Sequence, residues 1–201
     1  MKNFAEEMGI TGHLNITRRW NTGQEECLFD DHNVIVSGMG VGLSYLFTGS
    51  GSDSILDYQI DRFQVGVSGG TALETSSTYE LSGPLDTVAD YGTASKVYVK
   101  IGTQITNNSL TTDQAFVMIP KNKITRIDDS SVRYTLVLDE DACNDLTGGS
   151  GEEVYLSEIG MLMKNPRGNA TDQSILVCYR AFSDIRKTSD FSLIFRWTIN
   201  F

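Results

Sequence analysis

The sequence predicts an all-β fold, an antiparallel β-sandwich or jelly roll of about eight strands with one short helix near residues 34–47. The clearest sign is the C-terminal segment, where large apolar side chains occupy every second position: Phe191, Leu193, Phe195, Trp197, Ile199 and Phe201. Alternate side chains of a strand point to opposite faces, so this segment has one apolar face. The chain also lacks a repeating strand–helix–strand rhythm, which argues against a parallel sheet.

The N-terminal part predicts two strands. Leu14, Ile16 and Trp20 alternate with polar residues, which indicates a first strand with one buried face. A second strand is predicted from Gln24 to Phe29. Residues 1–13 precede this pattern and are expected to form an N-terminal arm on a single domain that spans residues 1–201.

The single helix is expected after Asp30–Asn33, whose polar side chains are suited to cap a helix N-terminus. The apolar residues from Val34 onward keep rough helical spacing to about Phe47. Three glycines interrupt this run, and each costs up to ~1 kcal/mol relative to alanine inside a helix. A buried strand followed by a turn therefore remains the alternative for this segment.

Alternating or continuous apolar runs predict the remaining strands. They lie at Ile60–Val67, Val97–Ile105, Ala115–Ile119, Val132–Leu138, Val154–Met163, Ile175–Phe182 and Phe191–Phe201. The last two flank the polar segment Asp184–Thr188 and are expected to pair as an antiparallel hairpin. Residues 68–82 are rich in Ser, Thr and Gly and predict a long surface loop. The core is expected to contain Ile159, Val177, Phe191, Phe195 and Trp197.

The composition restricts the classes of partner. The 201 residues carry a net charge of −10, so the surface repels phosphate backbones and direct nucleic-acid binding is not expected. The longest apolar stretch, Val34–Phe47, is shorter than the ~20 residues that span a bilayer, so no membrane partner is expected either. Three widely spaced cysteines, Cys27, Cys143 and Cys178, predict free thiols rather than zinc ligands or disulfides.

One serine matches a catalytic motif. Gly66–Gly70 satisfies the G-x-S-x-G pattern of a nucleophile elbow around Ser68. The residues that follow make a poor helix, and both histidines, His13 and His32, precede the serine. The order Ser, acid, His of that hydrolase class is therefore absent, and a glycine-rich turn after a strand is the favoured interpretation.

The other chemical motifs are weaker. The run Gly38–Gly42 lacks the spacing of a dinucleotide loop, so close helix packing or a flexible turn is favoured. The acidic stretch Asp139–Asp141, with Asp145, lacks the glycine and distal glutamate of an EF-hand, so a solvated turn is favoured. Small basic clusters are expected at strand ends and turns: Arg18-Arg19, Lys121–Lys123 and Arg186-Lys187. No catalytic, cofactor-binding or metal-binding residue is therefore predicted, and no cofactor.

The C-terminal part contains four segments in a distinctive order: YLSEIGML at 155–162, LVCYRAF at 176–182, KTSD at 187–190 and RWTINF at 196–201. In this order they resemble the EIGLF-type strand, the strand ending in Arg and Phe, the Lys-Thr turn and the final W-x-I-x-F of tailed-phage virion structural proteins. Weaker similarities precede them, at NVIVSGMG (33–40), FQVGVS (63–68) and LSGPL (81–85). The stretch between Asp86 and Asn108 departs from the shorter members of that family.

The resemblance implies a non-enzymatic virion component in the tail, collar, baseplate or fibre attachment, and it carries over no catalytic residue. Such a protein is expected to be made in the host cytoplasm, to reside in the virion, and to self-assemble into a symmetric homo-oligomer that contacts other virion structural proteins. Residues 68–82 and 150–153 are the candidate contacts.

Three other functions stay open. A capsid decoration protein would occupy the head instead of the tail. A carbohydrate-binding module would need exposed aromatic rings, for which Tyr79, Tyr91 and Tyr98 are the candidates. An enzyme would depend on Ser68 as its nucleophile.

Overall fold

The computed structural model describes residues 9–49, 58–71, 75, 77–85, 98–101, 105–106, 109–110, 114–148, 151–164 and 174–201. The strands are β1 (Thr11–Trp20), β2 (Glu25–Ile35), β3 (Ile60–Gly66), β4 (Tyr98–Ile101), β5 (Ile105–Thr106), β6 (Ser109–Leu110), β7 (Gln114–Met118), β8 (Ile124–Arg126), β9 (Ser131–Leu138), β10 (Leu156–Lys164), β11 (Ser174–Ile185) and β12 (Phe191–Asn200). The described helices are α2 (Ser37–Phe47) and the short 3₁₀ turns η2 (Gly69–Thr71) and η4 (Lys121–Lys123).

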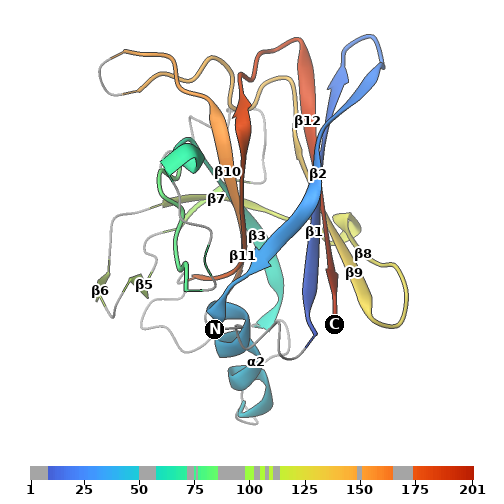
Figure 1. The fold of residues 1–201 in the computed structure, drawn as a ribbon, viewed down its shortest axis with the longest axis vertical. Coiled ribbons are helices and arrows are strands. Elements are labelled where there is room, and N and C mark those ends of the chain that lie inside the picture. The colour runs from blue at the N-terminus through green and yellow to red at the C-terminus, as the bar shows by residue number, and fades with distance from the viewer. Residues whose placement is uncertain are drawn as a thin grey trace.

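Ten strands form one curled antiparallel sheet in the order β4-β7-β3-β10-β11-β2-β1-β12-β9-β8 (Figure 1). The long strand β2 joins two parts of it, because most of β2 pairs with β1 whereas Val34 and Ile35 pair with β11. The sheet thus folds into two layers that face each other. We call β1, β12, β9 and β8 the solvent-facing layer, and β11, β10, β3, β7 and β4 the covered layer. The predicted all-β fold with one short helix is confirmed.

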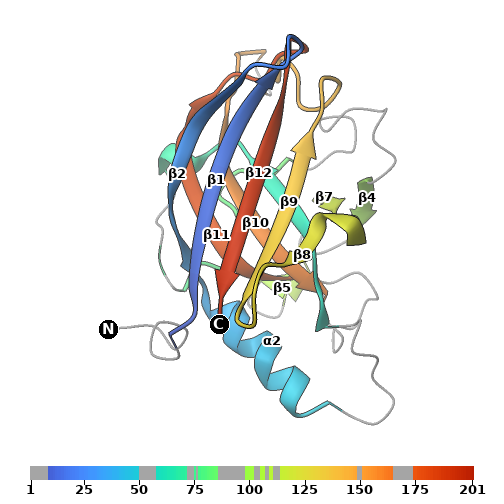
Figure 2. The ribbon, with the colours of Figure 1, turned by 90° about the vertical axis from the view of Figure 1, so that its right-hand side faces the viewer.

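In the solvent-facing layer, the C-terminal strand β12 lies between β1 and β9, as Figure 2 shows. Trp197 is opposite Leu14 on one side and Tyr134 on the other, and all three side chains are buried. The alternate residues point outward, where Arg196 donates a hydrogen bond to Thr17 Oγ1 at 3.0 Å. This layer follows the period-two pattern of the sequence because only its inner face is covered.

In the covered layer, most of β3, β10 and β11 is buried on both faces. On β10, Ile159, Met161 and Met163 join the main core, whereas Leu162 packs in a second apolar cluster with Leu81. That second cluster lies on the outer face, and it also contains Val36, Leu176 and Tyr179. The residues after β3 and the start of α2 therefore cover this layer, which explains why β10 and β11 contain continuous apolar runs instead of an alternating pattern.

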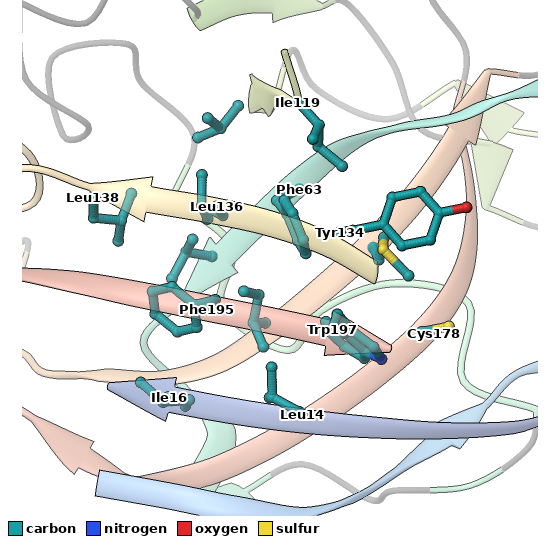
Figure 3. Packing of buried hydrophobic residues seen from close by; sticks show 14 of the residues in the cluster. Leu14, Ile16, Phe63, Ile119, Tyr134, Leu136, Leu138, Cys178, Phe195 and Trp197 are labelled. Atoms are coloured by element: carbon teal, nitrogen blue, oxygen red, sulfur yellow. The ribbon is translucent and has the colours of Figure 1, made fainter. Parts of the chain in front are cut away.

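Aromatic side chains from the two layers meet in the main core. The rings of Phe63 and Trp197 stack with centroids 6.1 Å apart (Figure 3). The rings of Phe182 and Phe195 have centroids 6.2 Å apart. The five residues expected in the core are all buried, which confirms that prediction.

The predicted hairpin between the last two long strands is wrong. β11 pairs with β10 and β2, whereas β12 pairs with β1 and β9. The short segment 186–190 therefore crosses from one layer to the other instead of making a tight turn within a layer. Strands that are neighbours in sequence often pair as a hairpin, which is why one was expected. Here β11 and β12 belong to opposite layers, and their apolar faces pack against each other across the core instead of pairing edge to edge.

The predicted helix cap is also wrong, although the helix itself is confirmed at Ser37–Phe47. Residues 30–33 belong to β2, which continues to Ile35, and Val36 occupies the N-cap position without a side-chain cap. Asp31 instead accepts a hydrogen bond from Arg180 at 2.8 Å, where β2 approaches β11. The extra length of β2 is needed to reach from one layer to the other.

Several boundaries differ from expectation. β1 begins at Thr11, so residues 11–13 belong to the sheet and not to the predicted arm. The single strand predicted over 97–105 is divided between β4, in the large sheet, and β5, which pairs with β6. The short strand β8 was not predicted. In the described part of the chain, no helix has the length and apolar character required to cross a bilayer.

Candidate functional site

Glu158 is a carboxylate fully buried on the outer side of β10, under the residues that follow β3. Its Oε1 accepts hydrogen bonds from the backbone N–H groups of Gly83, at 2.6 Å, and Ser68, at 3.4 Å. Its Oε2 accepts from the Ser82 N–H at 2.9 Å and from the Tyr179 hydroxyl at 2.8 Å. A buried charge is tolerated when hydrogen bonds replace its water, so Glu158 ties two backbone segments to the covered layer.

Ser68 takes part in this hydrogen-bond network through its backbone N–H group, which donates to Glu158. The next N–H, that of Gly69, donates to Ser157 Oγ at 2.9 Å, and a Cβ on Gly69 would collide with the Ser157 carbonyl. Glycine is therefore required here for close approach, in agreement with the interpretation as a glycine-rich turn. His13 and His32 lie opposite each other on β1 and β2, so the motif's serine and the two histidines belong to different layers.

The segment 68–82, expected to be a surface loop, is only partly so. Gly69 and Leu81 are buried against the covered layer, whereas the described residues Thr75, Ser77 and Tyr79 are exposed. The loop at residues 150–153 is exposed at Gly151 through Glu153, and Ser150 lies outside the described residues. Of the proposed sugar-stacking residues, Tyr79 is exposed, Tyr98 begins β4, and Tyr91 lies outside the described residues.

Lys187 is a buried cation in the segment that crosses between the layers, with only 2% of its surface exposed. Its Nζ donates to Asn144 Oδ1 at 2.9 Å and to the Thr188 carbonyl at 2.8 Å. The ammonium also lies 5.2 Å from the centre of the Phe191 ring. These contacts fix the crossing segment to the turn at residues 139–145.

The acidic turn at residues 139–145 lies beside the Lys187 ammonium, a contact that the interpretation as a solvated turn did not include. Burial lowers the pKa of Lys187, while Cys143 and the carboxylates of residues 139–141 oppose that shift. Cys143 and Asp145 adopt positive φ angles of 57° and 44°, which are uncommon for residues other than glycine. Among the described residues, no group of three or more His, Cys, Asp or Glu is placed to hold a metal ion.

A hollow of about 510 Å³ lies where α2 meets one end of the two layers. Its lining is mostly apolar and includes Met39, Leu43 and Leu46 of α2, Val132 and Tyr134 of β9, and Phe201 at the chain end. Figure 2 shows α2 crossing this end beside the C-terminus. The helix is held close because Gly38 contacts β11 where a Cβ would collide with the Leu176 carbonyl, and Gly42 lies against Met163. The glycine-rich run thus serves close helix packing, as predicted.

The basic clusters make ion pairs at the surface. Arg18 and Arg19 on β1 pair with Glu26 and Glu25 on β2, at 3.2 and 2.6 Å. Arg186 lies 3.0 Å from Glu153, whereas Lys121–Lys123 form the exposed turn η4. The three cysteines are free, with Cys143 and Cys178 buried and Cys27 exposed.

Three features escaped the sequence interpretation: Glu158, Lys187 and the hollow. Glu158 carried a usable signal, because a single carboxylate inside the apolar run 156–163 must find donors if the strand is buried. Lys187 carried none, since a lysine in a polar segment is normally exposed. The hollow depends on residues from α2, β9 and the chain end that only the tertiary fold brings together.

Comparison with known proteins identifies no relative. No family model matches the chain, and no curated protein or solved structure is significantly similar to it. The function has to be inferred from the residues and their contacts.

Proposed function

We propose that this protein is a non-enzymatic structural component of a tailed-phage virion, placed in the tail, collar, baseplate or fibre attachment. It is made in the host cytoplasm, self-assembles into a symmetric oligomer and contacts other virion structural proteins. The proposal starts from the ordered similarity of residues 155–162, 176–182, 187–190 and 196–201 to that class of protein.

The observation that carries the proposal is that three charged residues of those segments, Glu158, Lys187 and Arg196, make hydrogen bonds that connect strands and turns. Glu158 is saturated by three backbone N–H groups and the Tyr179 hydroxyl. Lys187 fixes the crossing between the layers through Asn144. Arg196 bridges β12 to β1 through Thr17. Each of these groups holds strands or turns in place, which suits a part whose role is to keep its shape.

The curled sheet also suits repeated assembly. Its layers keep the core fixed, while exposed residues such as Thr75, Ser77 and Tyr79 and the segment 151–153 are free to differ between structural proteins that share a scaffold. In a symmetric assembly, copies can cover the edge strands β4 and β8 of their neighbours.

The experiment is quantitative mass spectrometry of purified particles, followed by separation of heads from tails. The expected result is a fixed ratio of this chain to the major tail protein, retained after high-salt washing and present in the tail fraction. Recovery only with heads would favour a decoration protein. Absence from washed particles would contradict a structural role. A glycan array with the purified chain tests carbohydrate recognition separately, and no signal is expected.

A further inference from the structure

Helix α2 presents apolar side chains to solvent at the end of the molecule that carries the hollow. Phe47 is 80% exposed, and its neighbour Leu46 is 39% exposed at the rim of the hollow. Phe201 is also exposed and lines the same hollow. We call these three residues and the hollow the α2 patch. Contiguous apolar surfaces of this kind mark interaction sites in soluble proteins.

The polar side chains near the C-terminal end of the helix do not disturb this apolar character. Ser44 Oγ donates to the Val41 carbonyl at 2.8 Å, and Thr48 Oγ1 donates to the Ser44 carbonyl at 2.7 Å. Both hydroxyl groups are therefore satisfied within the helix and can be covered without losing a hydrogen-bond partner.

Charge indicates what covers the patch. Residues 34–49 contain no Asp, Glu, Lys, Arg or His, although the whole chain has a net charge of −10. Two copies of an acidic protein repel each other over most of their surfaces. In a two-fold contact the same surface meets itself, so any net charge on it would face a like charge. The side chains that line the hollow are also uncharged, so two copies can meet at this patch without repulsion between charged side chains.

The patch combines a hollow with projecting side chains. One side of α2 lines the hollow, and the last turn carries the projecting side chains of Leu46 and Phe47. We propose that the α2 patch is the self-association surface, with the projecting apolar side chains of each copy entering the hollow of a second copy. This inference rests on the proposed function in taking self-assembly as the protein's behaviour.

The test is sedimentation velocity of the full chain over a range of concentrations at physiological salt. The wild type is expected to form pairs of its 22.2 kDa chain. Phe47→Ser should weaken the association constant about 10- to 100-fold, because two fully covered aromatic side chains are lost per pair. Leu46→Glu should weaken it as well, by placing a charged side chain in the apolar contact. Val137→Glu is the matched control, since Val137 is 38% exposed on β9, and it should leave the association constant unchanged.

Hydrogen exchange of the wild type supplies a readout that needs no variant: the amides of α2 should gain protection as concentration rises.

A wild type that stays a single chain at every concentration would overturn the inference, and so would association that neither α2 substitution weakens. A single chain that carries an extra small mass in native mass spectrometry, lost on Leu43→Trp, would show that an apolar small molecule fills the hollow instead. The particle measurement above is independent of these results, so failure of the α2 surface and failure of the virion role are distinguishable.

Discussion

The two layers of the sheet bury their strands in different ways. β12, β1 and β9 leave much of one face to solvent, so buried and more exposed residues alternate along most of their length. β10 and β3 are covered on both faces, and their outer sides hold polar groups that are almost completely buried: Arg62, Gln64, Ser157 and Glu158. The buried polar groups of the solvent-facing layer are hydroxyl groups, such as that of Thr17, whereas the covered layer also buries charged side chains.

Because of this difference, substitutions in the two layers should reduce the stability of the protein by different amounts. A substitution on the outer face of the solvent-facing layer meets water and should cost little. An equivalent substitution in the covered layer leaves a buried donor or acceptor without a partner, which costs more than the hydrogen bond itself contributes. The following substitutions are ordered by the size of their expected effects.

Trp197→Ala should have the largest effect, because the core that both layers share would lose its largest side chain. The indole is fully buried and stacks on Phe63 across the layers. We expect a loss of about 3–5 kcal/mol in the free energy of unfolding, measured with urea. Trp20→Ala, at a partly buried position on β1, should cost clearly less. Equal losses for the two variants would contradict the placement of Trp197 at the centre.

Glu158→Gln should destabilise the protein by about 1–3 kcal/mol, because an amide nitrogen would replace an oxygen that accepts from backbone N–H groups or the Tyr179 hydroxyl. Glu153→Gln, at an exposed position, is the control and should stay within about 0.5 kcal/mol of wild type. Urea unfolding measures both. If the two substitutions had the same small effect, the covered layer would not depend on this carboxylate.

Gly69→Ala and Gly70→Ala test the same layer through neighbouring residues of η2. A Cβ at position 69 meets the Ser157 carbonyl, whereas position 70 has open space around it. Gly69→Ala should cost about 1–3 kcal/mol, and Gly70→Ala close to nothing. Thermal unfolding of the two variants, side by side, gives the comparison; equal melting temperatures would show that the segment after β3 is loosely held.

The smallest effect concerns alkaline pH. Burial raises the pKa of the Cys178 thiol above the ordinary value of 9.0. The folded protein therefore keeps this proton while the unfolded chain releases it, so stability falls as the pH rises above 9.0. Cys178→Ala should remove up to about 1.4 kcal/mol per pH unit of that slope. The exposed Cys27→Ala is the control. An unchanged slope in Cys178→Ala would place the thiol in contact with water.

The contrast between the layers also explains which parts of the fold could be predicted. β12 and β9 were found because one face meets solvent and the sequence alternates accordingly. β10 and β11 were located, but their partners were not, because residues buried on both faces give no period that fixes their neighbours. The wrong hairpin between β11 and β12 has this cause. The length of β2 was missed because Asp30 and Asp31 read as cap residues, while the tertiary fold uses them on a strand that crosses layers.

The candidate site was predicted less well than the fold. The favoured interpretation of Gly66–Gly70 as a glycine-rich turn after a strand agrees with the contacts of Gly69, although its close packing against Ser157 was not predicted. Lys187 depends on Asn144, and the α2 patch depends on Phe201. These residues are distant in sequence from their partners, so no local sequence pattern could predict the contacts.

The most direct measurement of the virion role is a cryo-electron microscopy map of the intact particle. The account predicts that the curled sheet fits repeated, symmetry-related density in the tail or its attachments, with α2 of neighbouring copies in contact. A map in which every such density is explained by other chains, or in which this chain is found only as isolated copies with α2 in open solvent, would contradict it.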